Sequence, residues 1–132
     1  MGRILGWGPA ALWAAVLFFL SELPGTGAGL PAGTDKWVHG GLYLILGLSL
    51  AWGKTRTGSG VPAVLLLLIG VGYGALDEWH QSFVPGRDVS VGDWVADSAG
   101  VMIGLLLFSG FSSRFRVDKR SPSQGTTTTG SV

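Results

Sequence analysis

Apolar residues dominate this chain in four long stretches, which alternate with shorter segments that hold the charged residues. Lys, Arg, Asp and Glu are absent from residues 4–21, 37–53, 57–76 and 98–113. Each stretch is close to the ~17–25 residues that a helix needs to cross the hydrocarbon core of a bilayer. Because backbone groups in lipid must hydrogen-bond within the protein, each span is expected to be helical. The pattern therefore predicts an all-α membrane protein, a bundle of four transmembrane helices with short loops.

The predicted organisation is one four-helix membrane domain at residues 1–113, followed by a tail at 114–132. We place the four helices at about residues 4–20, 36–53, 61–80 and 92–111. The tail is basic at first and then rich in Ser, Thr and Gly, a composition typical of disorder. A cleaved signal peptide is the alternative interpretation of the first apolar stretch, because Arg3 precedes it. That stretch exceeds the ~7–15 apolar residues usual in a signal peptide, so we prefer a membrane helix.

The composition supports a membrane location, since 47% of the residues are hydrophobic and 13% are charged. A soluble domain carries about 25% charged residues. Basic residues gather at the amino terminus, between the second and third helices, and in the tail: Arg3, Lys54, Arg56, Arg114, Arg116, Lys119 and Arg120. Most acidic residues lie in or beside the other two connections. Because basic loops stay in the cytoplasm, we predict a multi-pass plasma-membrane (inner-membrane) protein with both termini cytoplasmic.

Several kinds of chemistry are excluded or disfavoured by what the sequence contains. Cysteine is absent, which excludes disulfides, thiolate metal sites and cysteine nucleophiles. His39, His80 and several carboxylates are available as metal ligands, but there is no His-Glu-x-x-His motif, and we predict neither a metal nor a cofactor. The basic tail is short and is explained by contact with the membrane surface, so nucleic acid is not an expected partner.

Glycines follow a helical spacing in the third and fourth predicted helices. Gly70 and Gly74 share one face of the third helix, and Gly100 and Gly104 share one face of the fourth. Small residues at such spacing let membrane helices pack closely. Since the two helices are antiparallel neighbours, we expect glycine to face glycine across their interface.

Polar residues that could bind a ligand or take part in a reaction lie at the predicted outer ends of the second, third and fourth helices and in the loop between the last two. They are Asp35, Lys36, His39, Glu78, Gln81, Arg87, Asp93 and Asp97. Ionisable side chains in or beside a membrane are costly to desolvate and tend to mark function. We predict that they converge in one outward-facing polar cleft, with Arg87 as the main counter-charge of the carboxylates. The alternative is a hydrogen-bonded plug that only fixes the packing of the helix ends.

The same residues resemble the motifs of the VanZ-like family of small bacterial membrane proteins. Asp35-Lys36-Trp37-Val38-His39 resembles the family's Asp-Lys-x-x-His, and Glu78, Gln81, Pro85 and Arg87 resemble its Glu-x-x-Gln-x-x-x-Pro-x-Arg. Asp93, Asp97, Gly100 and Gly104 resemble its third motif, with Asp97 at a position that often holds Asn. The resemblance implies a multi-pass plasma-membrane protein. The founding member is linked to teicoplanin resistance, whereas most members have no established reaction.

We expect the cleft to bind an amphiphile of the cell envelope, such as a lipid-linked cell-wall component or a lipoglycopeptide, among the surrounding membrane lipids. Trp37, Trp79 and Trp94 flank the polar residues and suit the membrane interface. One alternative is an intramembrane enzyme acting on lipid head groups, with Glu78 or Asp93 as general base and His39 or His80 as its partner. A second alternative is a structural subunit of a membrane assembly, and no catalytic residue is assigned.

Overall fold

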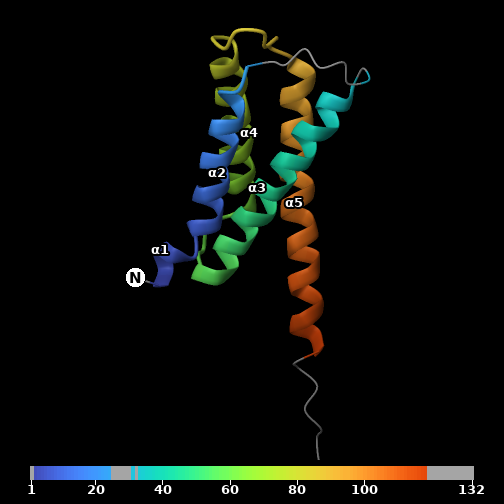
Figure 1. The fold of residues 1–132 in the computed structure, drawn as a ribbon. Coiled ribbons are helices and arrows are strands. Elements are labelled where there is room, and N and C mark those ends of the chain that lie inside the picture. The colour runs from blue at the N-terminus through green and yellow to red at the C-terminus, as the bar shows by residue number, and fades with distance from the viewer. Residues whose placement is uncertain (1, 25–30, 32, 119–132) are drawn as a thin grey trace, which may run out of the picture.

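The computed structural model describes residues 2–24, 31 and 33–118. The helices are α1 (Gly2–Leu5), α2 (Gly8–Ser21), α3 (Thr34–Thr57), α4 (Ala63–Gln81) and α5 (Val91–Asp118). No strand occurs among these residues, and the predicted all-α fold is confirmed. Figure 1 shows a bundle in which the amino terminus and the end of α5 lie at the same end of the molecule. α5 continues through residues 114–118, where the predicted tail begins, and residues 119–132 lie outside the described part.

The first predicted helix, at residues 4–20, is broken into α1 and α2. Pro9 occupies the first turn of α2, where its missing N–H leaves no helical hydrogen bond unmade. Trp7 lies between the two helices and packs against the face of α3. A Cβ atom added to Gly53 would come within 2.5 Å of the Trp7 ring, so Gly53 makes room for this contact.

α3 packs most extensively against α5, and the two backbones touch at glycines. A Cβ atom on Gly100 would collide with the carbonyl oxygen of Gly40, and one on Gly104 would collide with the carbonyl oxygen of Leu44. Gly47 lies equally close to the backbone of Val101. Small residues at a crossing allow this close approach. Packing of α3 against α5 therefore depends on glycine from both helices.

The predicted pairing of glycine stripes between α4 and α5 is wrong. A Cβ atom on Gly70 would lie 2.5 Å from a methyl group of Val101, and one on Gly74 would lie 3.3 Å from Cβ of Asp97. Gly100 and Gly104 face α3 instead. The physical reason is that neighbouring positions of a helix differ by about 100° in direction. One face of α5 packs on α4, and the adjacent face packs on α3.

Among the described residues, two helices are long and apolar enough to cross a membrane: α4, and α5 from Val91 to Ser112. α2 is apolar, but its 14 residues rise only about 21 Å, less than the ~30 Å hydrocarbon core. α3 is long enough to cross a membrane, but charged residues at both of its ends lower its mean hydropathy, so it is not among the helices that are apolar enough. The prediction of four spans therefore holds for α4 and α5 on length and composition.

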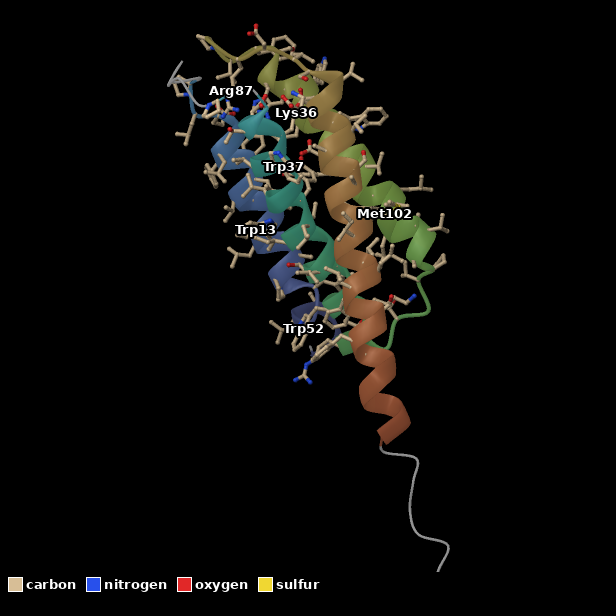
Figure 2. All side chains as sticks on the ribbon, turned by 90° about the vertical axis from the view of Figure 1, so that its right-hand side faces the viewer. Trp13, Lys36, Trp37, Trp52, Arg87 and Met102 are labelled. Carbon is tan, nitrogen blue, oxygen red and sulfur yellow. The ribbon has the colours of Figure 1, made fainter. Side chains whose placement is uncertain are left out.

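This bundle exposes many large apolar side chains, and its interior holds both apolar and charged residues. Phe19, Leu68 and Leu106 are exposed, whereas Leu66 and Asp97 are buried. In the view of Figure 2, side chains project outward along the length of the bundle. A continuous exposed apolar surface marks contact with lipid or with another protein. This arrangement fits a bundle that meets lipid on the outside.

Side chains also join the helices by donating hydrogen bonds to main-chain carbonyls. Trp13 of α2 donates to the carbonyl oxygen of Leu42 at 2.8 Å. The hydroxyl of Tyr73 donates to the carbonyl oxygen of Ala14 at 2.6 Å. Trp94 of α5 donates to the carbonyl oxygen of Val71 at 3.1 Å. Such bonds stabilise helix pairs where apolar packing alone gives little preference for one partner.

Candidate functional site

The predicted polar residues gather at the end of the bundle where α3 and α5 begin and α4 ends. Lys36 and Arg87 are labelled there in Figure 2, far from Trp52 at the opposite end. The buried members of the group are Asp77, Glu78, Gln81, Asp93 and Asp97. α3, α4 and α5 each supply at least one member, so the helix packing described above positions the site.

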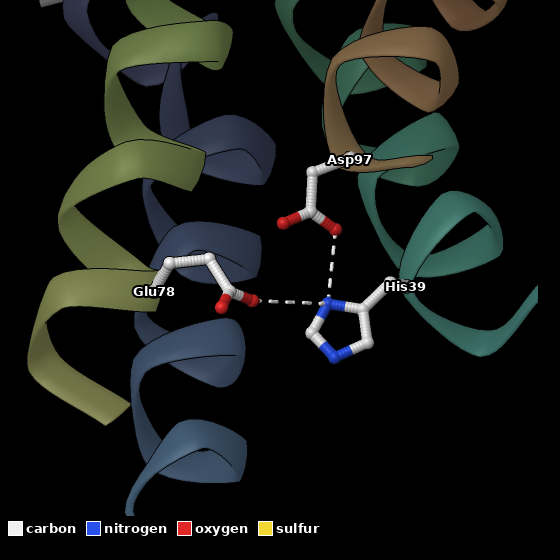
Figure 3. A group of neighbouring side chains, drawn as sticks. All are labelled: His39, Glu78 and Asp97. Atoms are coloured by element: carbon white, nitrogen blue, oxygen red, sulfur yellow. Dashed lines mark hydrogen bonds and ion pairs between the residues drawn. The ribbon is translucent and has the colours of Figure 1, made fainter. Parts of the chain in front are cut away.

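His39, Glu78 and Asp97 form the centre of the group (Figure 3). The Nδ1 atom of His39 lies 3.0 Å from Oδ1 of Asp97 and 4.0 Å from Oε1 of Glu78. One potential ligand atom from each residue lies within 4.8 Å of the other two. The side chain of His39 is 14% exposed, that of Glu78 is 6% exposed and that of Asp97 is fully buried. Three residues from three helices thus direct one nitrogen and two carboxylates at a common point.

Ser90 orients Glu78 from the start of α5. Its backbone N–H donates to Oε2 of Glu78 at 3.1 Å, and its hydroxyl accepts a hydrogen bond from the N–H of Asp93 at 3.3 Å. The second bond is a helix cap of the kind that serine commonly makes. Ser90 therefore fixes one oxygen of Glu78 and directs the other toward His39.

Two carboxylate oxygens at this centre are buried without a hydrogen-bond partner. They are Oε1 of Glu78 and Oδ2 of Asp97. Buried polar atoms are nearly always hydrogen-bonded in proteins, and leaving a charged one unpaired is unfavourable. Each carboxylate of the centre thus has one oxygen for which the described residues provide no hydrogen-bond donor, although His39 lies within ion-pair distance of both side chains.

Lys36 supplies the positive charge that the cluster does contain. Its Nζ atom lies 3.1 Å from Oδ1 of Asp93 and 3.5 Å from Oδ2 of Asp35. Asp93 is buried, whereas Asp35 and Lys36 are about half exposed. The lysine therefore reaches inward from the surface to Asp93, and Asp35 stays at the rim.

A second chain of hydrogen bonds runs from α3 across α4 to the following connection. The hydroxyl of Tyr43 donates to Oδ2 of Asp77 at 3.1 Å, and the amide of Gln81 donates to the same oxygen at 3.3 Å. Arg87 donates to the amide oxygen of Gln81 at 3.4 Å. Asp77 is thus held by two donors and belongs to the polar group.

Arg87 is not the counter-charge of the carboxylates, which corrects the sequence prediction. Its guanidinium donates to the carbonyl oxygens of Leu20 and Leu23, each at 3.1 Å. These carbonyls lie at the carboxyl end of α2, where the helix leaves acceptors unsatisfied and a cation is favourable. Among the lysines and arginines whose side chains the structure describes, Lys36 is the one that forms ion pairs with carboxylates.

A tight turn presents Arg87 to α2. The N–H of Arg87 donates to the carbonyl oxygen of Val84 at 3.2 Å, and Gly86 has φ of 77°. Pro85 followed by a glycine with positive φ is the sequence of a type II turn. A side chain at residue 86 would strain this conformation. The turn therefore explains why glycine follows proline here.

His80 lies outside the centre. Its Nε2 atom is 2.9 Å from Oε1 of Glu22, and its ring stacks on Phe18 with centroids 5.0 Å apart. These contacts join the end of α4 to the end of α2. The two histidines therefore lie at different positions, and of the two only His39 contacts the buried carboxylates.

A cavity of about 310 Å³ opens beside the cluster, between α2, α3 and α4. Apolar side chains line part of it: Leu17, Leu20, Leu23, Val38 and Leu42. Polar side chains line the rest: Ser21, His39, Tyr43, Asp77, Gln81 and Arg87. The first predicted helix therefore forms one wall of the cavity, a contribution that no polar motif in its sequence announces.

The structure brings all eight predicted site residues to one end of the bundle. Asp35, Lys36 and Asp93 form one chain of ion pairs beside His39, Glu78 and Asp97, while Gln81 and Arg87 line the cavity. The eight site residues predicted from the sequence did not include Asp77 and Ser90, which the structure adds to the site. Asp77 carries a usable signal, since an acid within an apolar helix needs partners.

An all-α bundle with many exposed apolar side chains and a buried polar cluster at one end is the arrangement expected of a membrane protein with a polar site. A family model described as VanZ/LLP1 matches residues 35–112, which include α4, most of α3 and α5, and all eight predicted site residues. The chain therefore belongs to the VanZ/LLP1 family, which confirms the resemblance seen in its motifs. Neither the curated proteins nor the solved structures that were compared gave a match.

Proposed function

We propose that this protein crosses the plasma membrane four times, with both termini in the cytoplasm and the polar cluster near the outer surface. The support is the position of the charges along the bundle. Lys54 and Arg56 occupy the last turn of α3, at the end of the bundle that also holds the amino terminus (Figure 1). Asp35, Asp88 and Asp93 occupy or adjoin the opposite end. Basic residues favour the cytoplasmic side, which places the acidic end outside.

The polar cluster and its cavity bind an amphiphile of the cell envelope, such as a lipid-linked cell-wall component or a lipoglycopeptide. One observation carries this proposal: the cavity is apolar on one part of its wall and polar on the other. Leu17 and Leu42 suit a hydrocarbon chain, whereas Gln81 and His39 offer hydrogen bonds to a head group. Ligand sites commonly combine apolar walls with a few placed polar groups.

A photo-crosslinking experiment tests the proposal. The full chain is purified in lipid nanodiscs and exposed to a polyprenyl-phosphate lipid whose chain carries a photoreactive diazirine. We expect peptides of α2 and α3 that line the cavity to be labelled, and Val38→Trp to lower labelling about tenfold by filling the space. Leu68→Trp is the matched control, because Leu68 is an exposed residue of α4 outside the cavity wall.

Equal labelling of the two tryptophan variants, or labelling spread over the whole lipid-facing surface, would contradict the amphiphile site. A lipoglycopeptide that competes with the labelled lipid would show which amphiphile class binds more tightly. Conversion of the lipid to a new product by the purified chain would favour the intramembrane enzyme instead.

A further inference from the structure

We propose that His39, Glu78 and Asp97 form a binding site for one divalent metal ion, and that Zn²⁺ fits this ligand set best. The sequence alone predicted no metal, because His39, Glu78 and Asp97 lie on three separate helices and form no local metal-binding motif. This inference does not depend on the amphiphile proposal, since it rests on the buried centre and not on the cavity beside it.

The ligand types and their spacing fit a metal ion. One imidazole nitrogen and two carboxylates are ligands that Zn²⁺ accepts, and Zn²⁺ binds them at ~2.0–2.2 Å, so that tetrahedral neighbours lie ~3.3–3.6 Å apart. Nδ1 of His39 lies 3.0 Å from one carboxylate and 4.0 Å from the other, distances on either side of that range. Small rotations of the side chains would bring the three atoms to a common centre.

The unpartnered oxygens give the second, independent observation. Oε1 of Glu78 and Oδ2 of Asp97 are buried and accept no hydrogen bond. A protonated His39 would donate a hydrogen bond to Oδ1 of Asp97 and lie 4.0 Å from Oε1 of Glu78, too far for a hydrogen bond, and it would leave Oδ2 of Asp97 without a partner. A cation bound between the side chains offers a ligand bond to Oε1 of Glu78, and one to Oδ2 of Asp97 where both oxygens of that carboxylate bind it.

Charge balance points the same way. Four carboxylates are buried in this region: Asp77, Glu78, Asp93 and Asp97. In the part of the chain that the structure describes, the lysine or arginine that pairs with any of them is Lys36, and it contacts Asp93. Arg87 is committed to main-chain carbonyls of α2. The ionisable partner of Glu78 and Asp97 is His39, so a divalent cation bound there would supply the positive charge that a neutral imidazole lacks.

Glu78 is held ready for such a role. The N–H of Ser90 fixes its Oε2 atom and leaves Oε1 directed at His39. Metal-binding carboxylates are commonly held in place by a hydrogen bond of this kind, which orients the ligand before the metal arrives. Three protein ligands leave a coordination position for water or for an oxygen of a bound molecule.

The test measures Zn²⁺ bound to the full chain purified in detergent micelles, by elemental analysis after dialysis against equal concentrations of Zn²⁺ and Mg²⁺. We expect one Zn²⁺ per wild-type chain and no retained Mg²⁺, because Mg²⁺ prefers ligand sets of oxygen alone. Asp97→Asn and Glu78→Gln should each reduce bound Zn²⁺ about tenfold or more. Asp88→Asn is the matched control and should retain the metal, since Asp88 is exposed in the connection between α4 and α5.

A measurement on the wild-type chain keeps the proposal falsifiable if the variants do not fold. X-ray absorption at the zinc edge should show the imidazole signature of one histidine together with oxygen ligands, and EDTA should lower the unfolding temperature. A wild-type chain that retains no zinc would overturn the proposal. A zinc spectrum without imidazole, or an Asp88→Asn variant that loses as much zinc as Asp97→Asn, would overturn it as well.

Discussion

At the scale of single residues, each carboxylate of the cluster depends on a particular donor. Asp77 accepts hydrogen bonds from Tyr43 and Gln81, Glu78 accepts one from Ser90, and Asp93 pairs with Lys36. Buried carboxylates are stable in such a place only while their partners remain. The removal of one donor should therefore be more harmful here than the loss of a similar bond elsewhere in the bundle.

Tyr43→Phe tests this dependence with a close control. The change removes a buried hydroxyl that donates to Asp77, and we expect the free energy of unfolding to fall by about 1.5–3 kcal/mol, as for other bonds to charged groups. Tyr73→Phe removes a hydroxyl that donates to the carbonyl oxygen of Ala14, so its loss should be about 0.5–1.5 kcal/mol. Unfolding by SDS titration measures both, and an equal or reversed order would contradict the account.

The sequence identified most of these residues but few of their partners. Motif spacing and the cost of charge near lipid drew attention to His39, Glu78 and Asp97, which the structure places together. The role of Arg87 was not predictable, because its acceptors are main-chain carbonyls of α2 more than sixty residues away. Main-chain carbonyls occur at every residue, so no side-chain pattern marks the ones that an arginine will reach.

At the scale of helices, Arg87 joins the connection between α4 and α5 to the end of α2. Arg87→Ala removes the bonds to Leu20 and Leu23. We expect a loss of about 1–2 kcal/mol of unfolding free energy, at the low end for a charged donor because the bonds are exposed. Arg56→Ala, which changes an exposed arginine in the last turn of α3, should have little effect. SDS titration in mixed micelles compares the two, and equal losses would show that Arg87 does not anchor α2.

The crossing of α3 and α5 supplies a second prediction at this scale. Gly104→Ala would press a methyl group into the carbonyl oxygen of Leu44, and we expect a loss of about 1–3 kcal/mol, as for other overpacked cores. Gly72→Ala meets nothing within 4 Å, so the higher helix propensity of alanine should make it neutral or stabilising by up to about 1 kcal/mol. Thermal unfolding monitored by circular dichroism measures the difference. If Gly104→Ala proved as stable as Gly72→Ala, the close packing of the two backbones would be wrong.

The helices themselves were more predictable than their contacts. Charge-free stretches indicated a helix at residues 61–80, close to the observed Ala63–Gln81, because lipid penalises charge in the middle of a span. Gly70 and Gly74 face α5 as predicted, whereas Gly100 and Gly104 face α3 instead of α4. A stripe specifies the direction of a face along one helix, whereas the choice of neighbour depends on how three helices pack together.

At the scale of the whole molecule, the proposed topology puts the polar cluster outside the cytoplasm. In that topology, Lys54 and Arg56 at the end of α3 would lie on the cytoplasmic side, and the exposed apolar side chains would face lipid. Because the connection between α3 and α4 is short and begins beside Lys54 and Arg56, it should stay on the cytoplasmic side. The absence of cysteine from the sequence lets single cysteines report this orientation without background.

The central claim is that the cluster and its cavity open to the outside, and labelling of single cysteines in intact cells tests it most directly. Asp88→Cys reports the connection between α4 and α5, Val38→Cys reports the cavity wall, and Ser59→Cys reports the opposite end. With a membrane-impermeant thiol reagent, we expect the first two to react in intact cells and Ser59→Cys to react only after the membrane is opened. Reaction of Ser59→Cys in intact cells, with protection of Asp88→Cys and Val38→Cys, would contradict the account.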